Sequence, residues 1–484
     1  MNVKYNKQFI NGVCRDGSSE IYYKDINPYS NEVITHIKLG NRDDIDEAYE
    51  SAKQAQKMWA KVSIEEKKQV LTRSAELFLE RNEEIINLLV IEAGSSVTKA
   101  HGEFLNTIVE IQNAVKYAER MREPQVFPSK LPGKENRVYH HPVGVIGAIS
   151  PFNFPLYSSM RVVAPAIAVG NAVVLKPDTQ THITGGSIIA DIFEQAGLPK
   201  GLLNVITFDI AEVGDHLIEH PIPRVISFTG STMAGKHIGE ICGKHLKRVS
   251  LELGGNNPFI VLEDADLEQA LNAAVFGKFF HQGQVCVGTN RMFIHRKHYE
   301  EFVTRFVDRA SQIPYGNPTD PRVIIGPLIN ENQIQKVIKI VENAKQEGAV
   351  LALEGKRVGN VVTPFVFTNV KQNSKLAQTE IFGPAATIIP FDTDAEVLQW
   401  ANNTEYGLTS AIFTQDIEKG IEFARSIESG MTHLNDTTVN MDSEAPFGGE
   451  KSSGIGRYGG DHGFAEFTTT KWVSVQKETR AFPF

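Results

Sequence analysis

V-G-V-I-G-A-I at residues 143–149 is the first of five short apolar runs that decide the fold. The others are A-V-V-L-K at 172–176, L-L-N-V-I-T at 202–207, R-V-I-S-F-T at 224–229 and R-V-S-L-E-L at 248–253. Helical stretches such as Thr184 to Ala196 separate them. Continuous apolar runs that alternate with helices are typical of a parallel sheet covered on both faces. The sequence therefore predicts an α/β fold with a Rossmann-like sheet over residues 143–253.

A second α/β alternation follows the first. Its predicted strands are F-I-V-L at 259–262, R-M-F-I at 291–294 and segments near Thr387 and Ile412. Its predicted helices run from Asp266 towards Phe280 and from about Val303 to Ile313. This spacing favours a second domain over an extension of the first sheet.

The first 120 residues are predicted to be largely helical after a short strand-like start. From Asp43 onward, apolar residues recur three or four positions apart, as on one helical face: Ile45, Ala48, Ala52, Ala55 and Trp59. Ser63 followed by Glu66 predicts a capping box that opens a second helix. The stretch 124–136 holds three prolines and a glycine, which indicates an arm between elements.

Composition excludes several classes of protein. The 484 residues carry a net charge of −9, which argues against a nucleic-acid partner or an anionic membrane surface. The first residues lack the apolar core of a signal peptide, and no apolar stretch is long enough to span a membrane, so we expect a cytoplasmic protein. Three cysteines without metal-ligand spacing predict neither a disulfide framework nor a metal site.

Cys286 is the first candidate for chemistry. It stands in F-F-H-Q-G-Q-V-C-V, where an apolar helix ends in a glycine-containing turn. Such a turn can present the thiol to a cleft, and backbone amides or a positively charged nicotinamide can stabilise the thiolate. A lone cysteine is otherwise more often a small buried hydrophobic residue.

Two polar residues are candidate partners for such a thiol. Glu252 ends an apolar strand in S-L-E-L-G-G, where burial would raise its pKa towards the range of a general base. Asn153, in S-P-F-N-F-P, is flanked by prolines and aromatic residues that would hold its amide as an oxyanion donor. The alternatives are a solvent-facing glutamate and an asparagine that merely forms a turn.

Two glycine-containing segments are candidate phosphate-binding sites. Gly230 and Ser231 follow the strand R-V-I-S-F and precede a helix, so their backbone and that helix N-terminus can receive a pyrophosphate. G-I-G-R-Y-G at 454–459 matches a dinucleotide-binding pattern literally. We reject it because no strand leads into it and too few residues remain for a βαβ unit.

Seven motifs together resemble the aldehyde dehydrogenase superfamily across essentially the whole chain. In chain order they are S-P-F-N-F-P, V-V-L-K-P, F-T-G-S-T, L-E-L-G-G-N-N-P, F-F-H-Q-G-Q-V-C-V, E-I-F-G-P and P-F-G-G-E-K-S-S-G-I-G-R. The resemblance implies that Cys286 is the nucleophile that forms a thiohemiacetal and then a thioester. It also implies that Glu252 activates the hydrolytic water, and that Asn153 holds the oxyanion.

The resemblance also implies a site for NAD or NADP. Lys176 would reach the adenosine ribose, and Glu380 the nicotinamide ribose, with Phe382 packing beside it. The remaining cofactor contacts would come from Ile149, Thr179, Gly230, Ser231 and Leu253. Thr179 stands where NAD-preferring members often carry a glutamate, and its lack of charge predicts that NADP is tolerated. Asn256 replaces a common lysine, and the sequence does not explain this change.

The resemblance divides the chain into three parts. Residues 1–120 and 143–253 would form the NAD(P)-binding domain, residues 254–452 the catalytic domain, and residues 121–142 and 467–484 an oligomerisation arm. The arm implies a homodimer or a homotetramer, through strand addition.

The substrate is predicted to be an aromatic aldehyde. Val285 and Val287 flank Cys286 with apolar surface, and Phe447 is a candidate wall of the pocket. The segments around Glu92 and Gly448 resemble bacterial benzaldehyde or vanillin dehydrogenases. Two alternatives stay open: a CoA-acylating or aliphatic semialdehyde dehydrogenase, and a non-catalytic structural or binding protein on the same fold.

Overall fold

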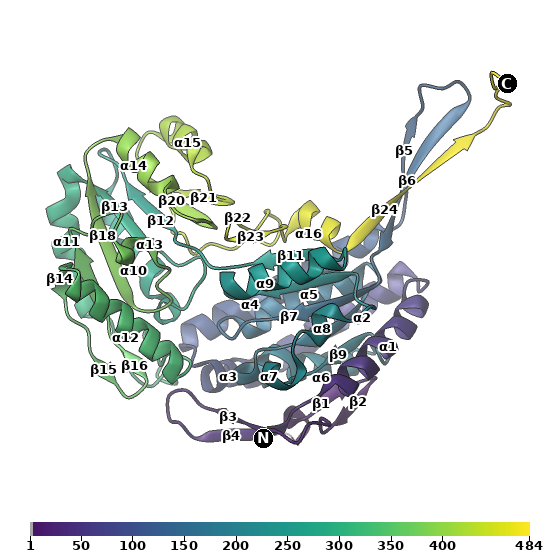
Figure 1. The fold of residues 1–484 in the computed structure, drawn as a ribbon, viewed down its shortest axis with the longest axis horizontal. Coiled ribbons are helices and arrows are strands. Elements are labelled where there is room, and N and C mark those ends of the chain that lie inside the picture. The colour runs from purple at the N-terminus through teal and green to yellow at the C-terminus, as the bar shows by residue number, and fades with distance from the viewer. Residues whose placement is uncertain (1–2) are drawn as a thin grey trace.

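A computed structural model describes residues 3–484 and consists of two α/β lobes and a projecting arm (Figure 1). The first lobe contains an eight-stranded sheet in the order β2-β1-β9-β8-β7-β10-β11-β23. Its strands are β1 (Gln8–Ile10), β2 (Val13–Arg15), β7 (Val145–Ile149), β8 (Ala172–Lys176), β9 (Leu203–Val205), β10 (Val225–Thr229), β11 (Arg248–Glu252) and β23 (Gly454–Ile455). The five predicted strands β7 to β11 are mutually parallel, which confirms the α/β fold.

Both faces of this sheet are covered by helices. The helices α5 (Pro155–Ala168) and α6 (Ile188–Gln195) pack on it after β7 and β8. The helix α8 (His216–Glu219) contacts both α1 (Arg42–Trp59) and α9 (Thr232–Lys244), and α9 packs on β10 and β11. Because parallel crossovers are right-handed, the change of direction between β7 and β10 puts α5 and α9 on opposite faces. The predicted helix 184–196 begins with a π-helical turn, Ile183–Ser187.

Helices from the first 120 residues form a further layer behind α5. They are α2 (Ile64–Glu80), α3 (Asn82–Ala93) and α4 (Val97–Arg120). Ser63 caps α2 by accepting a hydrogen bond from the backbone N–H of Glu66, which is one half of the predicted capping box; the Glu66 side chain does not complete it. The remaining short helix of this lobe is α7 (Ile210–Val213).

The edges of the first sheet differ from the prediction of a parallel sheet. β1 pairs antiparallel with both β2 and β9, and β23 pairs antiparallel with β11. The turn between β1 and β2 is Asn11-Gly12, and both residues have positive φ, 51° and 73°. A two-residue Asn-Gly turn with positive φ suits a tight hairpin, so this edge follows from local turn chemistry.

The structure corrects one part of the prediction for the rejected glycine motif at 454–459. The sequence predicted that no strand leads into it, but the short strand β22 (Glu450–Lys451) precedes it, and its first two residues form β23. This strand is antiparallel, and only the short helix α16 (Gly460–Glu466) follows it before the arm. The geometry is therefore not that of a βαβ unit, and the segment instead extends the sheet beside Glu252.

The second lobe contains a seven-stranded sheet in the order β14-β17-β18-β13-β12-β20-β21. Its strands are β12 (Pro258–Val261), β13 (Arg291–His295), β14 (Val350–Leu353), β17 (Phe365–Thr368), β18 (Ala385–Phe391), β20 (Thr409–Phe413) and β21 (Met431–Leu434). One face packs on α10 (Leu267–Phe279) and α11 (Arg296–Ser311). The other packs on α12 (Glu331–Gln346), α13 (Lys375–Gln378), α14 (Asp394–Asn402) and α15 (Ile417–Ser426).

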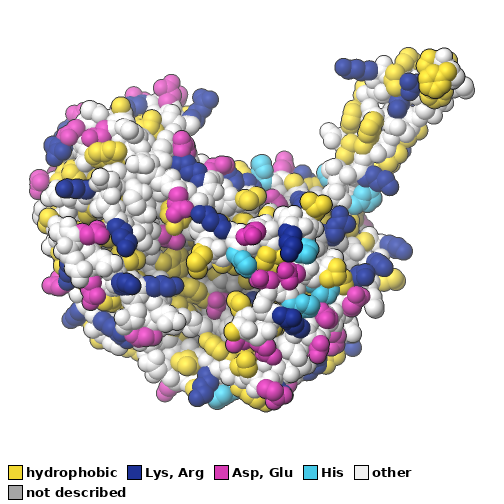
Figure 2. All heavy atoms as spheres, in the orientation of Figure 1, with side chains coloured by type: hydrophobic (Ala, Val, Ile, Leu, Met, Phe, Trp, Pro, Cys, Tyr) yellow, Lys and Arg dark blue, Asp and Glu magenta, His cyan; other side chains and the backbone are white. Residues whose placement is uncertain are grey.

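A three-stranded antiparallel sheet projects from the body as an arm (Figure 1). It is formed by β5 (Gln125–Pro128), β6 (Lys134–Pro142) and β24 (Thr468–Gln476). Figure 2 shows hydrophobic side chains gathered along this arm, and Val126, Phe127, Trp472 and Phe482 are exposed on it. Three two-stranded sheets complete the fold: β3 (Tyr22–Ile26) with β4 (Val33–Lys38), β15 (Arg357–Val358) with β16 (Val361–Val362), and β19 (Tyr406–Gly407) with β22 (Glu450–Lys451).

No helix within residues 3–484 is both long and apolar enough to cross a membrane.

Candidate active site

Cys286 lies just beyond a strained turn that follows α10. His281 and Gln282 have positive φ values of 50° and 58°, which non-glycine residues rarely adopt. The surroundings hold this turn in place, because Gln282 Nε2 donates to the backbone carbonyls of Gly94 (3.2 Å) and Pro327 (2.9 Å). A second anchor is Gln284, whose Oε1 accepts the N–H of Ile329 at 3.1 Å. Strain that is held by outside contacts is typical of functional segments.

The thiol of Cys286 is half-buried among apolar and aromatic side chains. The cluster around it consists of Phe154, Tyr157, Val285, Val287, Leu408 and Phe447. Burial first, and then the negative charge of Glu252, raise the pKa of Cys286 to about 12. The backbone N–H of Val287 and the charge of Arg161 act in the opposite direction. The predicted stabilisation of a thiolate by local amides is therefore too weak on its own, because burial outweighs it.

Glu252 is the last residue of β11 and is only 2% exposed. No protein group within residues 3–484 forms a hydrogen bond with either of its carboxylate oxygens. Burial raises the pKa of Glu252 to about 7, against the opposing charges of Arg161 and Arg457. The solvent-facing alternative is therefore wrong, and the carboxyl group titrates in the range that suits a general base.

Asn153 lies between β7 and α5 and is buried. Its Nδ2 donates to the backbone carbonyl of Gln284 at 2.9 Å, two residues before the thiol. An amide carries two N–H groups, so the second can serve a ligand. Asn153 is thus fixed to the loop that carries Cys286, although 131 residues separate it from Gln284 in the chain.

A buried ion pair that the sequence analysis missed supports Asn153. Glu103 Oε1 accepts the backbone N–H groups of Leu156 (2.9 Å) and Tyr157 (3.2 Å) at the start of α5. Its other oxygen accepts from Lys99 Nζ at 2.5 Å, and both side chains are fully buried. The only signal in the sequence was the four-residue spacing of Lys99 and Glu103 on one helix.

Phe447 and the residue after it close the site from the far end of the chain. Phe447 belongs to the cluster around Cys286. A side chain at Gly448 would come within 2.9 Å of Glu252 Oε1, so this glycine permits the backbone to pass the carboxylate. Residues 153, 252, 286 and 447 thus meet in one place.

The predicted cofactor residues lie at one edge of the first sheet. Ile149, Lys176 and Leu253 stand at the carboxyl ends of β7, β8 and β11, and Gly230 and Ser231 follow β10. Ligands of such sheets bind beyond the carboxyl ends, where the strand order changes direction. That change falls between β7 and β10, because the order of the parallel strands is β9-β8-β7-β10-β11.

The donor groups at this edge fit a dinucleotide. Ser231 is the N-cap of α9, and its side chain accepts the N–H of Ala234 at 3.3 Å, so the first turn of a 13-residue helix faces the edge. Lys176 is buried, its Nζ lies 5.7 Å from the ring of Phe208, and burial lowers its pKa. Asp178 and Asp209 oppose that shift. Thr179 begins a short 3-10 turn directly after this strand.

Glu380 lies on the side of the second lobe and is half-buried. Its Oε1 accepts the N–H of Gly255 at 3.1 Å, and a side chain at Gly254 would come within 2.3 Å of its carboxylate. Burial raises the pKa of Glu380 to about 7, while Gly255 and Lys278 oppose the shift. Phe382 packs edge-on against Phe152, with ring centroids 6.0 Å apart.

The structure explains Asn256, which the sequence did not. Its Nδ2 donates to the backbone carbonyl of Ala377 at 2.9 Å, three residues before Glu380. Its backbone carbonyl accepts from Arg291 Nε at 3.0 Å. Asn256 therefore fixes the segment that presents Glu380.

Arg161 is a further residue of the site that the sequence analysis missed. It lies in α5 in the apolar run L-Y-S-S-M-R-V-V-A, which offered no periodic signal. Its charge lowers the pKa of Glu252 and of Cys286.

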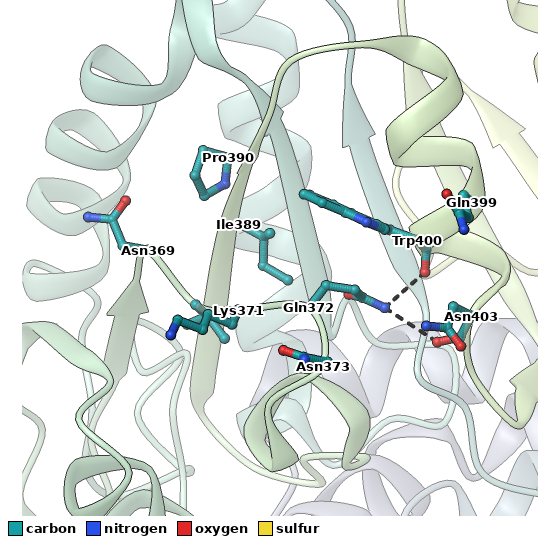
Figure 3. A pocket seen from close by; sticks show the side chains of 10 residues that line it. Asn369, Lys371, Gln372, Asn373, Ile389, Pro390, Gln399, Trp400 and Asn403 are labelled. Carbon is teal, nitrogen blue, oxygen red and sulfur yellow. Dashed lines mark hydrogen bonds between the residues drawn. The ribbon is translucent and has the colours of Figure 1, made fainter.

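A cavity of about 490 Å³ lies elsewhere, in the second lobe (Figure 3). Residues 369–373, Gln399, Trp400 and Asn403 contribute to its wall. Gln372 Nε2 donates there to the carbonyls of Trp400 (3.0 Å) and Asn403 (3.3 Å). None of the predicted site residues lines it, so it is separate from the candidate active site. Across residues 3–484, no cluster of His, Cys, Asp or Glu side chains is placed to hold a metal ion.

Comparison with known proteins gives consistent matches. The model of the aldehyde dehydrogenase family matches residues 15–473. Benzaldehyde dehydrogenase YfmT of Bacillus subtilis is 47% identical over 99% of both chains. Vanillin dehydrogenase of Corynebacterium glutamicum is 42% identical over 97% of this chain and 98% of its own. The crystal structure of an NAD-dependent benzaldehyde dehydrogenase from Corynebacterium glutamicum has a TM-score of 0.90 and 40% identity, and the match covers 98% of this chain and 99% of that one.

Proposed function

The chain belongs to the aldehyde dehydrogenase family, and from this premise we propose that it oxidises an aromatic aldehyde to the carboxylic acid with NAD or NADP. The observation that carries this proposal is the convergence of a half-buried thiol, a buried carboxyl group without hydrogen-bond partners and a fixed amide. A structural protein has no physical need for all three together.

In the first half of the reaction, Cys286 Sγ forms a bond to the aldehyde carbon. The thiol proton passes to Glu252, and the resulting oxyanion accepts hydrogen bonds from the Asn153 amide and the Cys286 backbone N–H. NAD(P)+, when bound, would accept the former aldehyde hydrogen as a hydride, which leaves the carbon with its electron pair. A thioester on Cys286 remains.

In the second half, Glu252 first releases the thiol proton to solvent and then takes a proton from the water that attacks the thioester carbon. The C–S bond then breaks, the acid leaves, and the sulfur recovers a proton. A carboxyl group with a pKa of about 7 can gain and lose this proton near neutral pH.

Two features support an aromatic substrate. Phe154, Tyr157 and Phe447 surround Cys286 with ring surface. Relatives that share 42–47% of their residues with this chain are named benzaldehyde and vanillin dehydrogenases. For the cofactor, Lys176 and the N-terminus of α9 support binding of a dinucleotide.

We further propose a division of labour among the parts of the molecule. Residues 1–120 and 143–253 bind the cofactor, residues 254–452 carry the nucleophile, and the arm, residues 121–142 and 467–484, joins subunits into a dimer or tetramer. The exposed hydrophobic residues of the arm support the last role.

The test is a panel of aldehydes assayed with NAD+ and NADP+, with reduced cofactor and acid product both quantified. Benzaldehyde should be among the best substrates, and Cys286→Ala should abolish its oxidation while cofactor still binds. A clear preference for short aliphatic aldehydes or succinic semialdehyde would reject the aromatic substrate. Formation of an acyl-CoA in place of the acid would reject the hydrolytic second half.

A further inference from the structure

Arg161 is a buried cation with few partners. It is 5% exposed, and among the described residues 3–484 its side chain forms one hydrogen bond, from Nη2 to Thr229 Oγ1, which is long at 3.4 Å. Within residues 3–484 its Nε has no hydrogen-bond partner, and the two carboxylates that interact with its charge, Glu252 and Glu110, form no ion pair with it. A guanidinium has five N–H donors, and burying them unpaired is unfavourable.

Arg291 shows how the same chain satisfies a buried arginine that serves structure. Arg291 is fully buried, and its guanidinium donates to the backbone carbonyls of Asn256 (3.0 Å), Trp400 (2.8 Å) and Ala401 (3.0 Å). Arg161 lacks any such set of acceptors. Packing alone therefore does not account for a guanidinium at position 161.

The surroundings of Arg161 connect it to the reacting thiol. Its Cζ lies 4.4 Å from the ring centroid of Tyr458, 4.8 Å from that of Phe447 and 5.8 Å from that of Tyr157. Phe447 and Tyr157 belong to the same apolar cluster as Cys286. The rings thus hold the cation at the wall of the space in which the aldehyde reacts.

We propose that Arg161 determines specificity by binding an anionic substituent on the ring of an aromatic aldehyde, either a carboxylate or a phenolate. The proposal rests on the proposed function, because the aldehyde must be covalently held at Cys286. A planar guanidinium binds a carboxylate through two parallel hydrogen bonds. The ring of such a substrate would pack on Phe447 and Tyr157, and its substituent would supply the acceptors that Arg161 lacks.

The experiment compares kcat/KM for benzaldehyde, 4-methylbenzaldehyde, 3- and 4-carboxybenzaldehyde and 4-hydroxybenzaldehyde. Arg161→Met removes the charge at similar length, and Arg161→Lys keeps the charge but loses the planar fork. Arg322→Met, at an 85% exposed side chain, is the control. Arg161→Met should lower kcat/KM for the neutral aldehydes as well, because it removes a charge that lowers the pKa of Glu252 and Cys286. We expect the loss for the better carboxybenzaldehyde to be about tenfold to a hundredfold larger than the loss for the two neutral aldehydes. Arg161→Lys should lie between.

An equal loss for all five aldehydes would overturn the proposal, because it would assign Arg161 a general effect on Glu252 and Cys286. A measurement without variants guards against misfolding. Against benzaldehyde, terephthalate or isophthalate should inhibit the unaltered enzyme at least ten times more strongly than benzoate. Equal inhibition by all three acids would also overturn it. If no aromatic aldehyde is oxidised at all, the proposed function fails; if benzaldehyde is oxidised without these differences, only this inference fails.

Discussion

Glu252 and Cys286 share one buried space, in which the carboxylate makes the thiol harder to ionise. The charge of Glu252 contributes to the raised pKa of the thiol, and burial raises both pKa values. Near neutral pH the thiol therefore stays protonated, while the carboxyl group can gain or lose its proton. The reactivity of the site therefore depends on which of the two groups carries a proton as much as on how close they lie.

The pH dependence of the reaction should report Glu252. Because the base must be deprotonated, kcat/KM should rise with pH through an apparent pKa of about 7. Glu252→Gln should remove that limb and lower steady-state turnover by about 10²–10⁴-fold. One equivalent of reduced cofactor should still form, but more slowly than in the unaltered enzyme, because the thiol has lost its proton acceptor. Rapid mixing and pH–rate profiles measure both effects. A variant that keeps the limb and turns over normally would show that Glu252 is not the base.

Cofactor selectivity should depend on residue 179. Thr179 adds no charge next to Lys176, although Asp178 and Asp209 are close enough to raise the pKa of that lysine. We expect kcat/KM with NADP+ to lie within a thousandfold of that with NAD+. Thr179→Glu should lower the NADP+ value at least tenfold through repulsion of the 2′-phosphate, and Thr179→Gln is the uncharged control. An unchanged cofactor ratio in Thr179→Glu would place the 2′-phosphate away from this residue.

At the scale of elements, the helix α5 connects the oxyanion donor to the protein core. Glu103 accepts hydrogen bonds from two backbone N–H groups in the first turn of α5, and it also forms an ion pair with Lys99. Carboxylates are favourable at helix N-termini, and this one is buried. Asn153 immediately precedes that turn, so its position depends on the contacts of α4.

Glu103→Gln should therefore destabilise the protein strongly. The substitution leaves the Lys99 ammonium buried without its counter-charge, which costs about 3–5 kcal/mol. Denaturant unfolding measures the loss, and Glu119→Gln, which breaks the exposed pair with Lys68, should change stability far less, because solvent screens that pair. The double variant Lys99→Met, Glu103→Gln should recover part of the loss. Equal effects of the two single variants would contradict the importance of the buried pair.

The sequence predicted elements better than it predicted contacts between them. Apolar runs identified β7 to β11 because strands buried on both faces have continuous hydrophobic patterns. Family motifs pointed to Glu380, whose position no local pattern reveals. The sequence did not indicate Arg161, because this residue stands in an apolar helix. It did not indicate the hydrogen bond from Asn153 to Gln284 either, because 131 residues separate the two in the chain. Only tertiary structure brings such pairs together.

On the scale of the whole chain, the arm is the part whose side chains are not buried against the two lobes. Its strands β5, β6 and β24 come from two distant parts of the chain, and hydrophobic side chains remain exposed on it. Exposed apolar surface of this kind commonly marks a contact with another protein.

The arm should therefore govern assembly. Light scattering should give the protein a mass that is twice or four times the 53.6 kDa of one chain. Replacing Phe127 and Trp472 by Lys should shift the mass towards a single chain, because buried lysines disfavour an apolar interface. Leu246→Lys, at a 94% exposed leucine outside the arm, should leave it unchanged. A wild-type mass of one chain would contradict assembly.

The raised pKa of the Cys286 thiol also affects how readily this thiol is oxidised or alkylated while the enzyme is not turning over. Peroxides and alkylating agents attack the thiolate, so a thiol that stays protonated resists conversion to sulfenic and sulfinic acids. Cys242 is similarly shielded, with a pKa raised to about 11 by burial, whereas Cys14 is exposed. Chemical ageing of the resting protein should thus begin at Cys14, far along the chain from the nucleophile. The burial that raises the pKa of the Cys286 thiol should therefore also protect the thiol from oxidation between turnovers.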